Sequence, residues 1–118
     1  MADYTIWHNP RCSTSRFVLQ ALRDAGAGVT VRDYQAQPPT TAELRVALDR
    51  LGMAPRALLR RRNTPYDQLG LGDPALTDDA LIAAMAEHPA LIERPVVFGP
   101  KDARLCRPKE TVFDMLAG

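Results

Sequence analysis

The chain has 118 residues and a net charge of +1, and 46% of its residues are hydrophobic and 25% charged. The length fits one compact domain, and the composition is that of a globular protein. A net charge near zero predicts neither nucleic acid nor an anionic membrane as a partner. Because no apolar run could span a bilayer and residues 1–4 lack the basic start of a signal peptide, we expect a cytoplasmic protein whose Cys12 and Cys106 stay reduced.

The first third of the chain predicts a strand, a helix and a second strand. Residues 5–7 are β-prone, and Asn9-Pro10 ends that run. Apolar residues recur at helical spacing over residues 14–25, and β-branched residues are frequent over residues 29–34. A strand–helix–strand unit of this length predicts that the two strands are parallel.

The middle of the chain predicts helices. Thr40 and Glu43 form a capping-box pattern in front of an apolar stripe. A short helix is expected over residues 55–61, and another helix is expected to begin after Thr77, with acidic residues in its first turn.

The last quarter of the chain predicts a β-hairpin followed by a helix. Residues 96–98 have the pattern of a buried strand, residues 99–102 that of a turn, and residues 104–106 that of the returning strand. Pro108 is expected to be the first residue of the last helix, where its missing N–H is tolerated.

The order of these elements predicts the fold class. A βαβ unit followed by ββα is the plan of the thioredoxin-like α/β fold. We therefore expect residues 1–118 to form a single domain of this fold, with a helical insertion at about residues 40–90 between its two halves.

Cys12 stands just before the first predicted helix. The unpaired amides and the dipole at a helix start stabilise an anion, so they lower the pKa of a thiol placed there. Arg11 and Arg16 add positive charge, and His8 would add more if protonated, or would orient the thiol by a hydrogen bond. We interpret Cys12 as a thiolate nucleophile; the alternative is a small cysteine that only packs at the helix start.

The residues after Cys12 limit the kind of thiol chemistry. Ser15 stands where a C-x-x-C redox motif has its second cysteine, and Val18 stands where a cysteine phosphatase loop has its arginine. Two cysteines and two histidines at these spacings do not make a zinc site, so we expect no metal and no bound cofactor. What remains is a lone thiolate that needs an external thiol to complete a redox cycle.

Three arginines stand at the ends of predicted elements. Arg60 lies late in RALLRRRN, and Arg94 and Arg107 each precede a proline. In a thioredoxin-like fold, a cis-proline stands at the start of the third strand, and the residue before this proline lies beside the cysteine helix. Arg94, which precedes Pro95, would occupy that position. The planar guanidinium matches tetrahedral oxyanions, although most arginines are solvated surface charges and spacing alone does not show that these three converge.

Five separated motifs occur along the chain: HNPRCSTSR (8–16), RALLR (56–60), PYDQLGL (65–71), ERPVV (93–97) and RLCRP (104–108). With these motifs the chain resembles the ArsC-type, glutaredoxin-coupled arsenate reductases over nearly its whole length. The resemblance implies a thioredoxin-like fold with a helical insertion. It also implies site residues: Cys12 as the nucleophile, Arg60, Arg94 and Arg107 as oxyanion ligands, and His8 and Ser15 as residues that tune the thiol.

The resemblance implies a reaction cycle as well. The Cys12 thiolate attacks arsenate and expels water, glutathione as co-substrate attacks the adduct so that arsenite forms, and glutaredoxin resolves the mixed disulfide. Cys106, which lies in one of the motifs, is interpreted as a structural cysteine.

Two alternatives remain open from the sequence. Well-known members of the family read C-G-T-S-R, whereas this chain has Ser13 at the second position. An ArsC-like thiol protein that acts on another oxyanion or on a glutathione mixed disulfide would carry the same site chemistry. An Spx-like regulator that contacts RNA polymerase would share the fold, but Ser15 removes the C-x-x-C switch that many of those regulators use.

Overall fold

The computed structural model describes residues 3–117. The chain divides into two compact units, which we call the sheet unit (Met1–Gln37 with Arg94–Gly118) and the helical unit (Pro38–Glu93). The predicted insertion at about 40–90 corresponds to the span of the helical unit. That the whole chain forms one domain stays a prediction.

The sheet unit contains four strands in the order β2-β1-β3-β4. β1 (Asp3–His8) runs parallel to β2 (Gly28–Asp33), as the strand–helix–strand pattern predicts. β3 (Val96–Phe98) is antiparallel to β1, and β4 (Ala103–Leu105) is antiparallel to β3. This arrangement confirms the predicted thioredoxin-like plan, in which the βαβ and ββα halves meet along β1 and β3.

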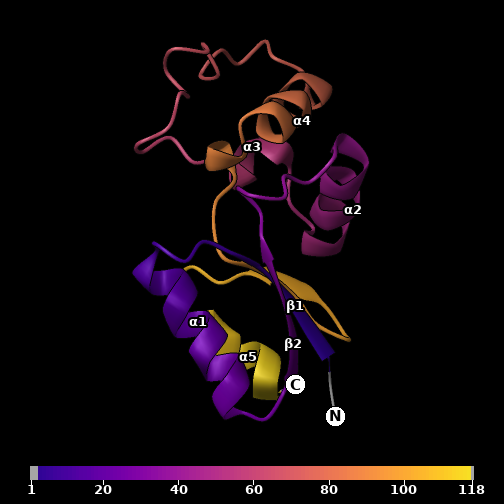
Figure 1. Ribbon diagram of the computed structural model, residues 1–118. Coiled ribbons are helices and arrows are strands. Elements are labelled where there is room, and N and C mark those ends of the chain that lie inside the picture. The colour runs from indigo at the N-terminus through magenta and orange to yellow at the C-terminus, as the bar shows by residue number, and fades with distance from the viewer. Residues whose placement is uncertain (1–2, 118) are drawn as a thin grey trace. The chain divides into compact units, whose positions relative to one another are not determined.

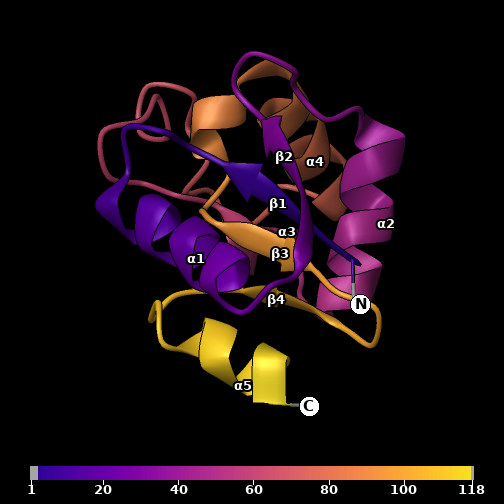
Figure 2. The same ribbon diagram turned by 60° about the horizontal axis from the view of Figure 1, so that its bottom comes forward.

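Two helices of the sheet unit lie side by side on one face of this sheet, as Figures 1 and 2 show. α1 (Ser13–Asp24) buries the stripe of Val18, Leu19 and Leu22, and α5 (Thr111–Ala117) packs beside it. Burying each such side chain stabilises the fold by about 1.5–3 kcal/mol. The core between sheet and helices consists of Tyr4, Ile6, Val18, Leu19, Leu22, Val97, Cys106, Val112 and Met115.

The helical unit contains α2 (Thr41–Leu51), α3 (Pro55–Leu58), α4 (Asp78–Glu87) and a 3₁₀ turn, η1 (Pro89–Leu91). The predicted capping box is confirmed: the Thr40 hydroxyl accepts from the Glu43 amide, and the Glu43 carboxylate accepts from the Thr40 amide. α4 packs against α2, α3 and η1. The buried apolar side chains of these elements are Leu44, Ala47, Leu48, Leu58, Leu81, Ile82, Met85 and Leu91.

Two predicted helix boundaries are wrong. α3 ends at Leu58 rather than at residue 61, because the backbone of residues 58–60 instead pairs with that of residues 91–93. α5 begins at Thr111 rather than at Pro108, and the intervening residues form turns in which the Thr111 amide donates to the Pro108 carbonyl. None of the helices within residues 3–117 is long and apolar enough to cross a membrane.

Candidate active site

The loop between β1 and α1 is shaped by Asn9. Its carbonyl accepts a hydrogen bond from the Cys12 amide at 3.0 Å, and its Oδ1 accepts from the Arg11 amide at 2.9 Å. Asn9 is buried, and its backbone N–H donates to the Ser15 hydroxyl. These bonds fold residues 9–12 into a turn that delivers Cys12 to the start of the helix. The sequence prediction treated Asn9 only as a strand breaker, although an asparagine in front of proline also favours such a side-chain-capped turn.

Cys12 is the N-cap residue of α1. Its backbone is extended, with φ of −94° and ψ of 121°, and its carbonyl accepts the first helical hydrogen bond from the Arg16 amide. Cys12 is partly exposed to solvent. The predicted position of Cys12 at a helix start is confirmed.

Two arginines from the other half of the sheet unit reach this sulfur. Arg107 Nη1 lies 3.9 Å from Cys12 Sγ and also donates to the Arg94 carbonyl at 2.9 Å. The Arg94 side chain donates a hydrogen bond to the thiolate as well. Both arginines precede cis-prolines, Pro95 and Pro108, which confirms the predicted cis bond after Arg94. The structure therefore brings Cys12, Arg94 and Arg107 together.

The pKa of Cys12 is lowered from 9.0 to about 7. Partial burial of the thiolate raises this pKa, but hydrogen bonds from the Ser15 backbone amide and from the Arg94 and Arg107 side chains outweigh it. Close to neutral pH, a large share of Cys12 is therefore the nucleophilic thiolate.

His8 and Ser15 contact each other. A hydrogen bond of 2.7 Å joins His8 Nδ1 to the Ser15 hydroxyl, and both side chains are buried. The Ser15 hydroxyl bonds His8 and accepts from the Asn9 backbone amide, and the Ser15 backbone N–H is among the groups that lower the pKa of Cys12. Burial lowers the pKa of His8, although the charge of Asp33 opposes this, so the environment favours the neutral imidazole. That these residues tune the thiol stays a prediction.

Arg60 belongs to the helical unit, where its side chain is held by two contacts. Nη1 forms an ion pair with Glu93 Oε1 at 2.8 Å, and Nε donates to the Arg62 carbonyl at 3.2 Å. The assignment of Arg60 as an oxyanion ligand stays a prediction from the resemblance. Sequence reasoning missed Glu93, although it stands directly before Arg94 in the ERPVV motif.

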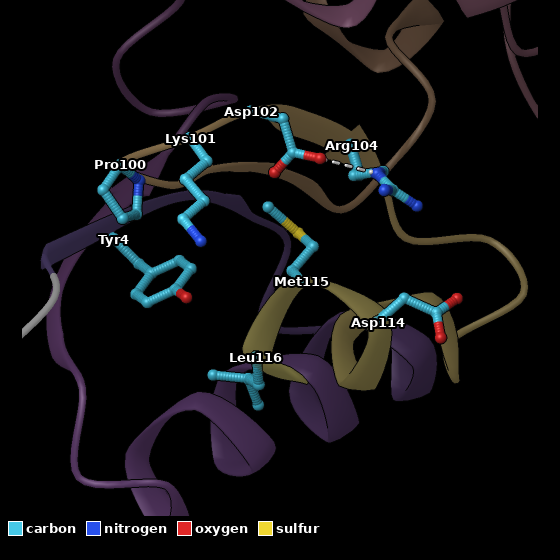
Figure 3. A pocket seen from close by; sticks show the side chains of 8 residues that line it. All are labelled: Tyr4, Pro100, Lys101, Asp102, Arg104, Asp114, Met115 and Leu116. Atoms are coloured by element: carbon cyan, nitrogen blue, oxygen red, sulfur yellow. Dashed lines mark hydrogen bonds and ion pairs between the residues drawn. The ribbon is translucent and has the colours of Figure 1, made fainter. Parts of the chain in front are cut away.

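A cavity of about 310 Å³ lies elsewhere in the sheet unit, between the β3–β4 hairpin and α5 (Figure 3). It is lined in part by Tyr4, near the start of β1, whereas Cys12 follows the end of that strand. An ion pair of 2.9 Å between Asp102 and Arg104 closes one side of the cavity. The cavity therefore lies apart from the cysteine site. Over residues 3–117, no cluster of three or more His, Cys, Asp or Glu side chains could hold a metal ion.

Cys106 differs from Cys12 in every respect that matters for reactivity. It is fully buried, its Sγ lies 3.9 Å from Met115 Sδ, and burial raises the pKa of its thiol to about 12. A thiol in this state packs in the core and does not act as a nucleophile at neutral pH. The interpretation of Cys106 as structural fits this environment.

The fold and the site define a thioredoxin-like protein with one helix-start thiolate held by arginines. The sequence model of the ArsC family matches residues 7–115, and the chain belongs to that family. It is 48% identical to an arsenate reductase of Rhizobium meliloti over 95% of this chain and 80% of that one. It is 47% identical to an arsenate reductase of Escherichia coli over 98% and 82% of the two chains. The structure of an arsenate reductase from Vibrio cholerae superimposes with a TM-score of 0.91 at 44% identity, covering 95% of this chain and 96% of that one.

Proposed function

We propose that this chain is an arsenate reductase of the cytoplasm that uses glutathione and glutaredoxin as its reductants. The observation that carries the proposal is the Cys12 thiolate, which receives hydrogen bonds from Arg94 and Arg107 in a chain nearly half identical to proteins named arsenate reductases. An anion binds best where cationic forks and helix amides already point at it.

The first step is attack of the thiolate on arsenate. The Cys12 sulfur forms a bond to arsenic, and one arsenate oxygen leaves as water after it takes up protons. The guanidinium groups of Arg94 and Arg107 neutralise the oxyanion as it approaches the negative sulfur, and they stabilise the charge on the remaining oxygens. Arg60 is the third oxyanion ligand in this proposal.

The second step reduces arsenic. A glutathione thiolate attacks the Cys12 sulfur, a disulfide bond forms, and the sulfur–arsenic bond breaks with its electron pair passing to arsenic, which changes from As(V) to As(III) and leaves as arsenite. The glutaredoxin thiolate then attacks the glutathione sulfur and releases the Cys12 thiolate. An external thiol resolves this disulfide because the buried, protonated Cys106 is a poor candidate for that role.

The test is arsenite formation by the purified protein with arsenate, glutathione, glutaredoxin and NADPH-driven recycling of glutathione. Wild type and Cys106→Ser should form arsenite, and Cys12→Ser should form none. Omitting glutaredoxin should leave Cys12 as a glutathione mixed disulfide, which mass spectrometry detects. If folded wild-type protein with an alkylatable Cys12 forms no arsenite, arsenate is not its substrate, and other oxyanions and glutathionylated substrates become the candidates.

A further inference from the structure

We propose that Glu93 is a positioning residue that fixes the guanidinium of Arg60 for the oxyanion. This inference rests on the proposed function, because it takes Arg60 as an oxyanion ligand. The two side chains form a short ion pair within the helical unit, with 14% of Arg60 and 21% of Glu93 exposed. A pair so shielded from water keeps a defined geometry better than a solvated one.

The backbone sets this geometry. The Arg60 amide donates to the Leu91 carbonyl at 2.7 Å, and the Glu93 amide donates to the Leu58 carbonyl at 2.9 Å. Leu59 and Ile92 are the residues opposite each other in this short antiparallel bridge. Arg60 and Glu93 are therefore diagonal neighbours, a spacing that long side chains bridge.

Within residues 3–117, the guanidinium of Arg60 is anchored through Nη1 and Nε. A guanidinium carries five N–H donors, one on Nε and two on each terminal nitrogen. Glu93 takes one donor of Nη1, and the Arg62 carbonyl takes the donor of Nε. These two anchors fix the plane of the group, and the donors of Nη2 are the ones that this proposal assigns to the oxyanion. The negative charge of Glu93 also offsets part of the positive charge of Arg60. Arg60 therefore recognises its ligand more by the geometry of its N–H hydrogen bonds than by net electrostatic attraction.

The neighbouring Arg61 provides a matched control. Its Nε forms an ion pair with Asp67 at 3.1 Å in the same unit, but these side chains are 71% and 69% exposed. Exposed pairs of this kind are worth little, so removing Asp67 tests for a nonspecific effect of losing one acidic charge.

The experiment compares Glu93→Ala, Glu93→Asp and Glu93→Gln with Asp67→Ala in the arsenite assay. Losing one charge-assisted anchor of Arg60 should raise KM for arsenate about ten-fold in Glu93→Ala, with a smaller change in kcat. Glu93→Asp, which draws the carboxylate back by one methylene, should behave like Glu93→Ala. Glu93→Gln keeps the accepting oxygen in place and should stay near wild type, as should Asp67→Ala.

A double-mutant cycle separates positioning from a general structural role. In an Arg60→Ala background, Glu93→Ala should add no further rise in KM, because the group that Glu93 positions is gone. An equal rise in both backgrounds overturns the proposal, and so does a Glu93→Gln variant as impaired as Glu93→Ala. Should Glu93→Ala fail to fold, the contrast between Glu93→Asp and Glu93→Gln decides the matter alone.

Calorimetric titration with arsenate, on the unreactive Cys12→Ser protein, distinguishes failure of this inference from failure of the proposed function. Suppose that wild type forms no arsenite, that arsenate nevertheless binds, and that Glu93→Ala weakens this binding only when Arg60 is present. The proposed function then fails, and the positioning role of Glu93 stands. If wild type forms arsenite and Arg60→Ala leaves KM unchanged, the function stands and the positioning role falls. If wild type forms no arsenite and arsenate does not bind, both are overturned.

Discussion

Removing the Arg107 guanidinium should raise the pKa of the Cys12 thiol. Arg107 Nη1 lies 3.9 Å from the sulfur and is one of three donors that stabilise the thiolate against the cost of its partial burial. In Arg107→Ala, the Ser15 amide and Arg94 remain. The pKa should therefore move up from about 7.

The size of the effect on reactivity follows from two opposing factors. At pH 7, a thiol with a pKa of 9.0 is about 1% ionised, whereas Cys12 with a pKa of about 7 is about half ionised. A drop of about two units in pKa also makes the thiolate about ten-fold less nucleophilic, since the Brønsted slope is about 0.4–0.5. Wild-type Cys12 should thus react about five-fold faster than an ordinary thiol at pH 7 and about ten-fold more slowly above pH 9.

The assay is the rate of iodoacetamide alkylation between pH 5 and pH 10, with Cys12→Ser as the blank. The wild-type rate should rise with pH around a midpoint near 7 and then level off. Arg107→Ala should shift the midpoint upward and give a higher plateau. Arg104→Ala is the control, because its side chain pairs with Asp102 and does not reach the sulfur. A wild-type midpoint near 9, or an unchanged midpoint in Arg107→Ala, would refute the reasoning.

Other substitutions test the packing around the site. Ser15→Ala leaves the buried Asn9 amide without its acceptor and should lower the free energy of unfolding in urea by about 1–3 kcal/mol; equal stability would contradict the hydrogen bond. Gly99→Ala places a Cβ 2.9 Å from the buried Tyr4 ring and should cost about 1–3 kcal/mol, seen as a lower melting temperature. The Cys106 thiol stays protonated up to about pH 12 when folded but ionises near 9.0 when unfolded, so stability should fall as pH rises between these values, and fall less in Cys106→Ala.

The sequence carried enough information to locate the nucleophile, because the relevant rules are local. A β-prone run, a turn signal and an apolar stripe of period 3.6 place Cys12 at a helix start without knowledge of the rest of the chain. The capping box at Thr40 is local in the same way. The position of Arg94 required the fold plan, and the cis bond at Pro95 agrees with it.

What the sequence left undetermined depends on contacts between distant residues. The run RALLRRRN favours a helix through residue 61, but hydrogen bonds to residues 91 and 93 prevail over that local preference from Leu59 onward. The Arg60–Glu93 pair results from this bridge, so no pattern near either residue could predict it. Likewise, the bond between His8 and Ser15 exists only because a turn returns the helix start to the end of β1.

The separation of β1 from β3 along the chain has an entropic consequence for the insertion. Ile6 lies opposite Val97, so the sheet closes only after the whole helical unit has been passed. Loop-closure entropy grows with the logarithm of length, at about 0.6 kcal/mol for each doubling, so added or deleted residues within the insertion change the cost of pairing these strands little. The position at which the chain leaves the insertion and enters β3 is, by contrast, fixed. The Cys106 amide donates to the Pro95 carbonyl at 3.0 Å and fixes where the chain enters β3, and that anchor holds Arg94 in place whatever the length of chain before it.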